Sequence, residues 1–193
     1  MVVKMADIGQ KWLNVLIPFS FDYRKELTAS EVSRRMGVAV RTVFRILNKL
    51  VSLNILRYVE EGRNKKFRLN LPDERVRMMM FMVEGYKSLK FSREEFYLDI
   101  VDVIKKREVV LFGSRVKGYG RKGSDIDIMV LGKRDEDLLK MVSGKVSCHF
   151  ISLVEFKKLL KEGNVLAEEI IENHVVFGGG SFVDFCWGHF GKS

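Results

Sequence analysis

The sequence predicts an α+β protein made of two modules that are joined by a helix. Basic charge is concentrated in residues 1–72, which hold 14 Lys and Arg against 6 Asp and Glu, whereas residues 73–193 hold 20 against 19. Residues 1–72 also combine helical spacing of apolar side chains with the pattern of a β-hairpin. Residues 92–178 alternate helix and strand patterns around Asp125 and Asp127. An uneven basic charge of this kind indicates a nucleic-acid-binding module beside a nearly neutral one.

The basic module begins with three predicted helices. Apolar residues recur at helical spacing over residues 5–18. Thr28 and Glu31 have the spacing of a capping box, and the helix that they begin is predicted to stop at Gly37. After a short turn, a third helix is predicted from Arg41 to Leu53. Its inner stripe consists of Val43, Leu47 and Leu50, which leaves Arg41, Phe44, Arg45, Asn48 and Lys49 outside.

A predicted hairpin follows, with strands at residues 55–61 and 65–71 and a basic tip at residues 62–64. Together with the helices, it resembles the winged helix-turn-helix family of DNA-binding domains over residues 5–71. The resemblance implies that the third helix enters the major groove of DNA and that the hairpin contacts the backbone or the minor groove. The residues implied to contact DNA are Arg41, Arg45, Lys49, Arg63, Lys65 and Lys66. The alternative is a helix-turn-helix that contacts protein, with these side chains merely solvated.

A linker helix is predicted next, over residues 73–91, with its apolar stripe at Val76, Met79, Met80, Val83 and Tyr86. The methionine-rich run at residues 78–82 is interpreted as core or as a dimer interface, and a ligand surface is the weaker alternative. Because winged-helix proteins often dimerise through a helix after the hairpin, a homodimer is predicted.

The second module, residues 92–178, is predicted to begin with a helix over residues 92–106, capped by Ser92 and Glu95. Strands are predicted at residues 107–112, 125–131 and 145–152, and helices at residues 135–143, 154–161 and 165–173. A C-terminal tail at residues 179–193 follows three glycines and is rich in aromatic residues. The sequence thus predicts four parts, at residues 1–72, 73–91, 92–178 and 179–193.

The most informative chemistry lies around Asp125 and Asp127. Residues two apart on a strand point to one face, and two adjacent carboxylates repel unless a cation lies between them. Mg²⁺ prefers such oxygen ligands. Gly113 and Ser114 end the preceding strand, where backbone N–H groups and a hydroxyl can bind phosphate. This combination predicts a nucleoside triphosphate ligand. The glycines at 118, 120 and 123 have dinucleotide-binding spacing but lack its strand-to-helix context, so that fingerprint is rejected.

The stretch Gly113-Ser114-Arg115-Val116-Lys117-Gly118, followed by Ser124-Asp125-Ile126-Asp127-Ile128, resembles the nucleotidyltransferase domain of the DNA polymerase beta superfamily, in its minimal prokaryotic branch. Its fusion to a winged helix resembles an arrangement found mainly in archaea. The resemblance implies that Gly113, Ser114 and Ser124 belong to the nucleotide-binding motif and that Arg115 and Lys117 neutralise phosphate charge. Asp125 and Asp127 would hold Mg²⁺ while a nucleoside monophosphate moves onto an acceptor hydroxyl.

The resemblance also implies a third carboxylate on the next strand, residues 145–152, but that segment contains no acid. By spacing, His149 takes the acidic position. It could act as a base or metal ligand, or it could be an ordinary packed histidine. The sequence therefore predicts an intact nucleotide-binding half and an incomplete catalytic half.

Three functions remain open from the sequence. The first is a DNA-binding regulator whose second module binds Mg–NTP with weakened or lost transferase activity. The second is an active nucleotidyltransferase that acts on a nucleic-acid or protein hydroxyl, and the third is an antitoxin-like partner of a toxin. Two distant cysteines, Cys148 and Cys186, no signal-peptide pattern and no long apolar run predict a cytoplasmic protein without a membrane segment.

Overall fold

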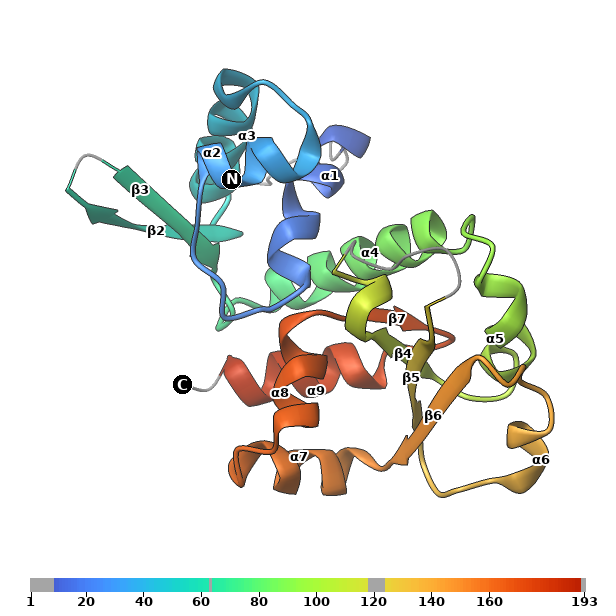
Figure 1. Ribbon diagram of the computed structural model, residues 1–193. Helices are drawn as coiled ribbons and strands as arrows, with labels where there is room; N and C mark the ends of the chain where they lie inside the picture. The colour runs from blue at the N-terminus through green and yellow to red at the C-terminus, as the bar shows by residue number, and fades with distance from the viewer. Residues whose placement is uncertain (1–8, 63, 118–123, 192–193) are drawn as a thin grey trace. The chain divides into compact units, whose positions relative to one another are not determined.

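The computed structural model describes residues 9–62, 64–117 and 124–191, and it confirms the predicted α+β class (Figure 1). The chain forms two compact units. Unit 1 comprises Met1–Val83 with Cys186–Ser193, and unit 2 comprises Glu84–Phe185. The boundaries between the units fall inside two helices, so the four-part division expected from the sequence stays a prediction.

Unit 1 has the predicted order of three helices followed by a β-hairpin. Its helices precede a hairpin of β2 and β3, which projects away from them in Figure 1, and we refer to this hairpin as the wing. A short strand, β1, pairs antiparallel with β3 and gives the sheet order β1-β3-β2. The elements are α1 (Gln10–Ser20), β1 (Leu27–Thr28), α2 (Ala29–Met36), α3 (Val40–Ser52), β2 (Leu56–Glu61) and β3 (Asn64–Leu69).

The ends of α2 form as the sequence predicts. Thr28 Oγ1 accepts a hydrogen bond from Glu31 N at 3.3 Å, and Thr28 N donates to the Glu31 carboxylate at 2.7 Å. These hydrogen bonds from Thr28 hold the pKa of Glu31 below its ordinary value. Gly37 ends the helix with φ +63°, a conformation that favours glycine.

The core of unit 1 lies among α1, α2, α3 and the sheet. Val43, Leu47 and Leu50 of α3 are fully buried, as predicted from their spacing. Phe67 of β3 is also fully buried and lies opposite both Leu27 and Tyr58 in the sheet. The outer face of α3 therefore remains available to solvent, because its inner face carries the apolar contacts.

Helix α4 (Glu74–Phe91) occupies the predicted linker region. Val76, Met79, Met80 and Val83 are buried, which confirms the predicted stripe at these four positions, whereas its fifth member, Tyr86, is only half-buried. Among the described residues, no helix has both the length and the apolar character needed to cross a membrane.

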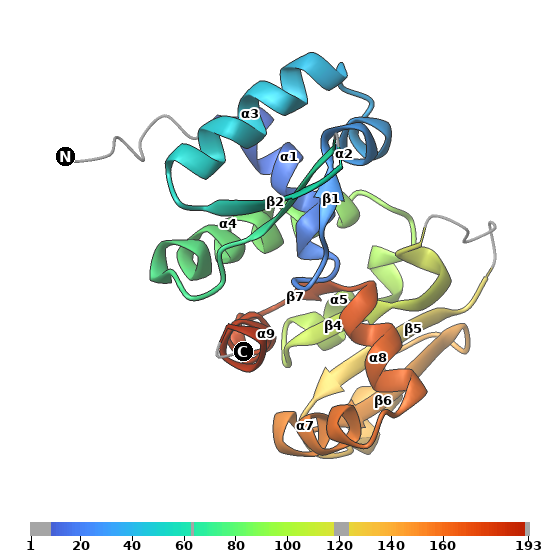
Figure 2. The ribbon, with the colours of Figure 1, turned by 90° about the vertical axis from the view of Figure 1, so that its left-hand side faces the viewer.

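Unit 2 is built on a mixed sheet of order β6-β5-β4-β7, in which β5 and β6 are parallel and the other pairs antiparallel. Helix α8 packs against β4, and α7 packs against α8 (Figure 2). The elements after α4 are α5 (Tyr97–Ile104), β4 (Val109–Phe112), the 3₁₀ turn η2 (Gly113–Arg115), β5 (Ile126–Leu131), α6 (Glu136–Leu139), β6 (Val146–Ile151), α7 (Leu153–Lys161), α8 (Val165–Glu172), β7 (Val175–Phe177) and α9 (Ser181–Phe190).

The predicted capping box at Ser92 is wrong. The Ser92 hydroxyl donates to Leu89 O at 3.0 Å, near the end of α4, and α5 begins only at Tyr97. Four elements have no counterpart in the prediction, namely β1, η2, β7 and α9. The start of α9 is held by Glu108, whose carboxylate accepts hydrogen bonds from the backbone N–H groups of Ser181 and Phe182 at 2.9 and 2.8 Å.

Candidate functional site

The first part of the candidate site is the contact between Gly113 and Asp127. Phe112, the last residue of β4, lies opposite Asp127 in the antiparallel pair with β5. Gly113 follows with φ +75°, and a Cβ atom placed on it would lie 2.6 Å from Asp127 Oδ2. Glycine is therefore required both by the backbone conformation and by the space that the carboxylate occupies. The local fold thus places a carboxylate directly against the Gly113-Ser114 turn.

The two aspartates form the second part. Asp125 is exposed just before β5, and Asp127 is half-buried on it. Burial raises the pKa of Asp127; His149 opposes this shift, and the negative charges of Asp125 and Glu169 add to it. A nearby cation stabilises the charged form of a carboxylate whose pKa is raised in this way. The two carboxylates offer oxygen ligands of the kind that Mg²⁺ prefers.

The third part is β6, which runs parallel to β5. Ser147 is the partner of Asp127 in the register, and His149 lies two residues further on the same face. The His149 ring packs against Phe112 with centroids 5.7 Å apart, and its Nε2 lies 3.3 Å from Ser147 Oγ. Strand β6 thus presents a serine and a histidine to Asp127, where the resemblance implies an acid.

The basic residues of the loop have specific partners. Arg115 Nη2 donates to Ser124 O at 2.6 Å, and its guanidinium lies over the Phe96 ring at 5.9 Å. The Lys117 ammonium lies 2.7 Å from Glu169 Oε1. In this state Arg115 joins the two sides of the loop that connects β4 and β5. Its Nε atom and the Ser124 hydroxyl are both buried without a hydrogen-bond partner among the described residues.

Glu169 of α8 is a site residue that the sequence analysis missed. It pairs with Lys117 and contributes to the raised pKa of Asp127, so its carboxylate belongs to the same electrostatic site. The sequence signal was only an acid on the polar side of a predicted helix. Across the part of the chain that the structure describes, no three His, Cys, Asp or Glu side chains are grouped to hold a metal ion.

In unit 1, the outer face of α3 carries the predicted DNA contacts. Arg41, Arg45 and Lys49 are exposed, and none forms an ion pair with a residue that the structure describes. Asn48 is turned back onto the helix, since its Nδ2 donates to Phe44 O at 2.9 Å. The three cations therefore form an uncompensated positive surface.

The wing differs from α3 because its lysines are paired with acids. Lys65 lies 3.7 Å from a Glu60 oxygen and over the Tyr58 ring at 4.0 Å, and Lys66 lies 2.5 Å from a Glu61 oxygen. Part of the basic charge expected on the wing is thus neutralised within the hairpin. The other predicted wing residue, Arg63, lies outside the described residues, as do Gly118, Gly120 and Gly123 of the rejected fingerprint.

Comparison with known proteins bears on unit 2. A family model described as "Polymerase beta, Nucleotidyltransferase" matches residues 99–179. Residues 99–179 form a nucleotidyltransferase-fold domain. The matched segment contains the Gly113 turn, both aspartates, His149 and Glu169. A search of curated proteins finds no significant match to the chain.

Two solved structures show a distant likeness. Human N-acetylserotonin methyltransferase, in complex with SAM, is 15% identical with a TM-score of 0.28, and the match covers 44% of this chain but only 30% of that protein. TrmBL2, an archaeal chromatin protein whose structure shows a novel mode of DNA binding, is 14% identical with a TM-score of 0.27 over 93% of this chain and 90% of that chain. Scores this low support no inference about fold or function.

Proposed function

We propose that the protein is a DNA-binding regulator whose nucleotidyltransferase-fold domain binds Mg–NTP with weakened or lost transferase activity. The observation that carries this proposal is the approach of the Asp127 carboxylate to Gly113, because it places a metal ligand beside a turn able to bind phosphate. A purely structural strand has no need for a half-buried carboxylate of raised pKa next to a second aspartate.

In this proposal the backbone N–H groups of the Gly113-Ser114 turn and the Ser114 hydroxyl hold the phosphates. Asp125 and Asp127 hold the metal, which supplies positive charge against the phosphate oxygens when bound. Lys117 can exchange its ion pair with Glu169 for a phosphate contact, whereas Arg115 and Ser124 keep the loop in place.

The weakened activity is inferred from β6. Deprotonation of an acceptor hydroxyl calls for a carboxylate near the metal ligands, and β6 offers Ser147 and His149 there. Calorimetric titration with Mg–ATP is the direct test of nucleotide binding. Heat saturating below millimolar nucleotide is expected, and an absence of heat at millimolar concentrations would remove the nucleotide half of the proposal.

The DNA half rests on the unpaired cations of α3. Replacing Arg41, Arg45 and Lys49 by glutamine is expected to weaken binding to duplex DNA. Each phosphate contact contributes about 0.9 to the slope of log K against log salt, so losing three lowers the slope by about 2 to 3. Fluorescence anisotropy at several salt concentrations measures both the affinity and the slope.

The matched control for this experiment removes the same charge elsewhere. Lys133, Lys157 and Lys161 are exposed residues of unit 2, and their triple replacement by glutamine is expected to leave the salt slope almost unchanged. Equal slopes for the two triple variants would mean that the helix-turn-helix does not contact DNA through α3.

Glu169 supports a second candidate function, an active nucleotidyltransferase. The Glu169 carboxylate comes from α8 rather than from β6, and it lies close enough to Asp127 to raise the pKa of Asp127. In such a reaction a bond forms between an acceptor oxygen and the α-phosphorus, and pyrophosphate leaves. The proton of the acceptor hydroxyl passes to a carboxylate. Glu169 can serve as this base once Lys117 leaves their ion pair and binds the phosphates.

A transfer assay separates the two candidates. If the enzyme is active, label from α-³²P-NTPs becomes covalently attached to DNA, RNA or protein, and Glu169→Gln lowers the rate about 100-fold or more, the loss typical for a general base. Glu155→Gln, an exposed acid on α7, is the control and should keep the wild-type rate. Transfer that survives Glu169→Gln would exclude this role for Glu169.

The homodimer stays a prediction. A candidate dimer surface is the side of α4 opposite the buried stripe. There Met78 is 64% exposed and Met82 is 49% exposed, with Phe81 between them.

A further inference from the structure

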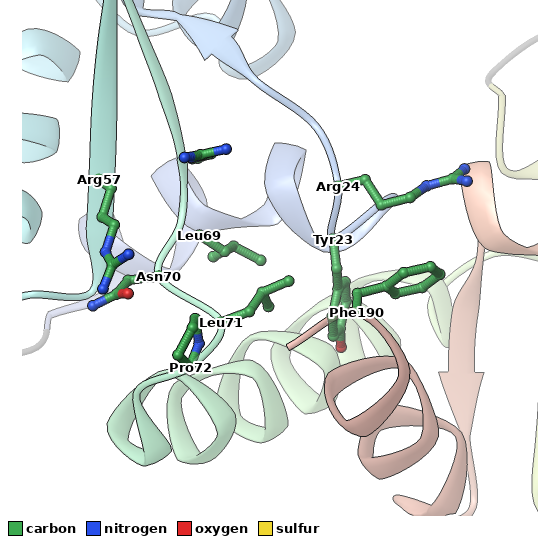
Figure 3. Close-up of a pocket in the computed structure, with 9 residues that line it drawn as sticks. Tyr23, Arg24, Arg57, Leu69, Asn70, Leu71, Pro72 and Phe190 are labelled. Carbon is green, nitrogen blue, oxygen red and sulfur yellow. The ribbon is translucent and has the colours of Figure 1, made fainter. Parts of the chain in front are cut away.

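Unit 1 contains a pocket at the base of the wing, with a volume of about 370 Å³. This volume lies in the range of about 300–1,000 Å³ that is typical of small-molecule sites. Its lining comes from the loop after α1, from β2 and β3, from the segment after β3 and from the end of α9. Figure 3 shows Arg57 on one side of two leucines and Tyr23 and Phe190 on the other. The pocket therefore has a charged side and an aromatic side.

The charged side is built from two arginines in direct cross-strand register. Arg57 of β2 and Arg68 of β3 are antiparallel partners, so their side chains leave the same face of the sheet. Like charges in this arrangement destabilise a sheet. Arg68 is 3.4 Å from Glu26, but Arg57 forms no ion pair with any residue that the structure describes. An anion between the two guanidinium groups would relieve their repulsion.

A buried amide oxygen adds a second, independent requirement for a ligand. Asn70 lines the pocket and is only 4% exposed. Its Nδ2 donates to Asn54 O at 2.8 Å, which fixes the orientation of the amide, whereas Oδ1 is buried without a hydrogen-bond partner among the described residues. Because leaving a buried acceptor unpaired costs about 1–3 kcal/mol, such an oxygen is expected to meet a donor from a ligand.

The opposite side is suited to a flat ring. Tyr23 is buried, and Phe190 is half-buried with the Arg24 guanidinium over its ring at 5.4 Å. Arg24 forms an ion pair with Asp22 at 3.0 Å. We therefore assign it to supporting the Phe190 ring and not to binding the anion. Aromatic walls of this kind bind the faces or edges of nucleobases and similar rings.

We propose that this pocket binds a nucleoside monophosphate, with its phosphate between Arg57 and Arg68 and its base against Tyr23 and Phe190. The Asn70 Oδ1 atom accepts a hydrogen bond from an exocyclic amino group, which favours adenine or cytosine over uracil. The site lies wholly in unit 1 and uses none of the residues of the Gly113 site, so it goes beyond the proposed function and does not depend on it.

The test uses the full chain with the unit 2 site disabled. The Asp125→Asn and Asp127→Asn double variant is titrated calorimetrically with AMP in the presence of EDTA, which removes metal-dependent binding from the measurement. AMP is expected to bind at least about 10-fold more tightly than inorganic phosphate, adenosine or UMP, because each of these lacks at least one of the three contacts. Failure of Mg–ATP binding to the wild type would leave this result unaffected.

In the same background, Arg57→Gln with Arg68→Gln is expected to weaken AMP binding by about 10- to 100-fold, the loss typical of two charge-assisted hydrogen bonds. Arg34→Gln with Arg35→Gln, an exposed pair on α2, is the control of equal charge and should bind AMP as before. The folding of each variant is checked by its melting temperature.

Three results would overturn the proposal. Equal AMP affinities for the Arg57/Arg68 variant and its control would place the site elsewhere. Inorganic phosphate that binds as tightly as AMP would make the pocket a simple anion site. Displacement of AMP by stoichiometric duplex DNA, with a loss of DNA affinity in the Arg57/Arg68 variant, would make these arginines part of a DNA-binding surface.

Discussion

Replacing Lys87 by methionine is expected to lower the free energy of unfolding by about 3–5 kcal/mol, the cost of removing the lysine from a buried ion pair. The Lys87 ammonium is completely buried and lies 2.8 and 2.9 Å from the two carboxylate oxygens of Glu84, which is 2% exposed. His174, 1% exposed, places Nε2 3.4 Å from Glu84 and Nδ1 3.1 Å from Ile170 O. Chemical denaturation measures the change.

The effect of pH on this variant has a definite sign. Burial raises the pKa of Glu84, but Lys87 and His174 outweigh burial and hold it below its ordinary value. The stabilisation is therefore present above the ordinary pKa of a glutamate and is lost as the pH falls through the lower, folded pKa. Without Lys87, burial favours the protonated acid, so the difference in stability between wild type and variant should narrow as the solution is acidified.

A double variant tests whether the cost comes from the Glu84 charge that remains buried without Lys87. Glu84→Leu combined with Lys87→Met is expected to recover most of the lost free energy, because an apolar pair can replace a buried ion pair. Lys105→Met removes an exposed lysine that is paired with Asp102, and it should leave the free energy of unfolding almost unchanged. A double variant as unstable as Lys87→Met would show that packing, and not charge, sets the loss.

The elements that could be predicted from the sequence are those whose signals are local. The capping box of Thr28 and Glu31 and the left-handed Gly37 depend on residues a few positions apart, and both are present. Ser92 and Glu95 have the same spacing, yet Ser92 bonds to the end of α4 instead. The pattern alone could not distinguish these cases, because a serine hydroxyl serves the preceding helix as readily as the following one.

The elements that could not be predicted depend on distant partners. Strand β7 is three residues long and exists through its pairing with β4, more than sixty residues earlier in the chain. The start of α9 is held by Glu108, the residue just before β4, which lies more than seventy positions earlier in the chain. In the candidate site, the motif predicted that Gly113 and Asp127 belong to one site, whereas the place of Glu169 needed the packing of α8 on β4.

Gly113→Ala is expected to weaken Mg–ATP binding by at least about 100-fold, comparable to the loss of two good hydrogen bonds to a charged ligand. The added Cβ would lie 2.6 Å from Asp127 Oδ2, so either the carboxylate or the turn must move, and φ +75° disfavours alanine in any case. Asp125→Asn with Asp127→Asn should cause a similar loss by removing the metal ligands. Calorimetry with Mg–ATP measures both.

Gly144→Ala is the matched control, because a Cβ at that exposed glycine meets no atom within 4 Å. It should bind Mg–ATP as the wild type does. If Gly113→Ala bound Mg–ATP normally while the aspartate variant did not, the aspartates would hold the nucleotide without the turn. If the reverse held, the phosphates would bind to the turn alone. Only a joint loss agrees with one site in which the phosphate turn and the carboxylates act on the same ligand.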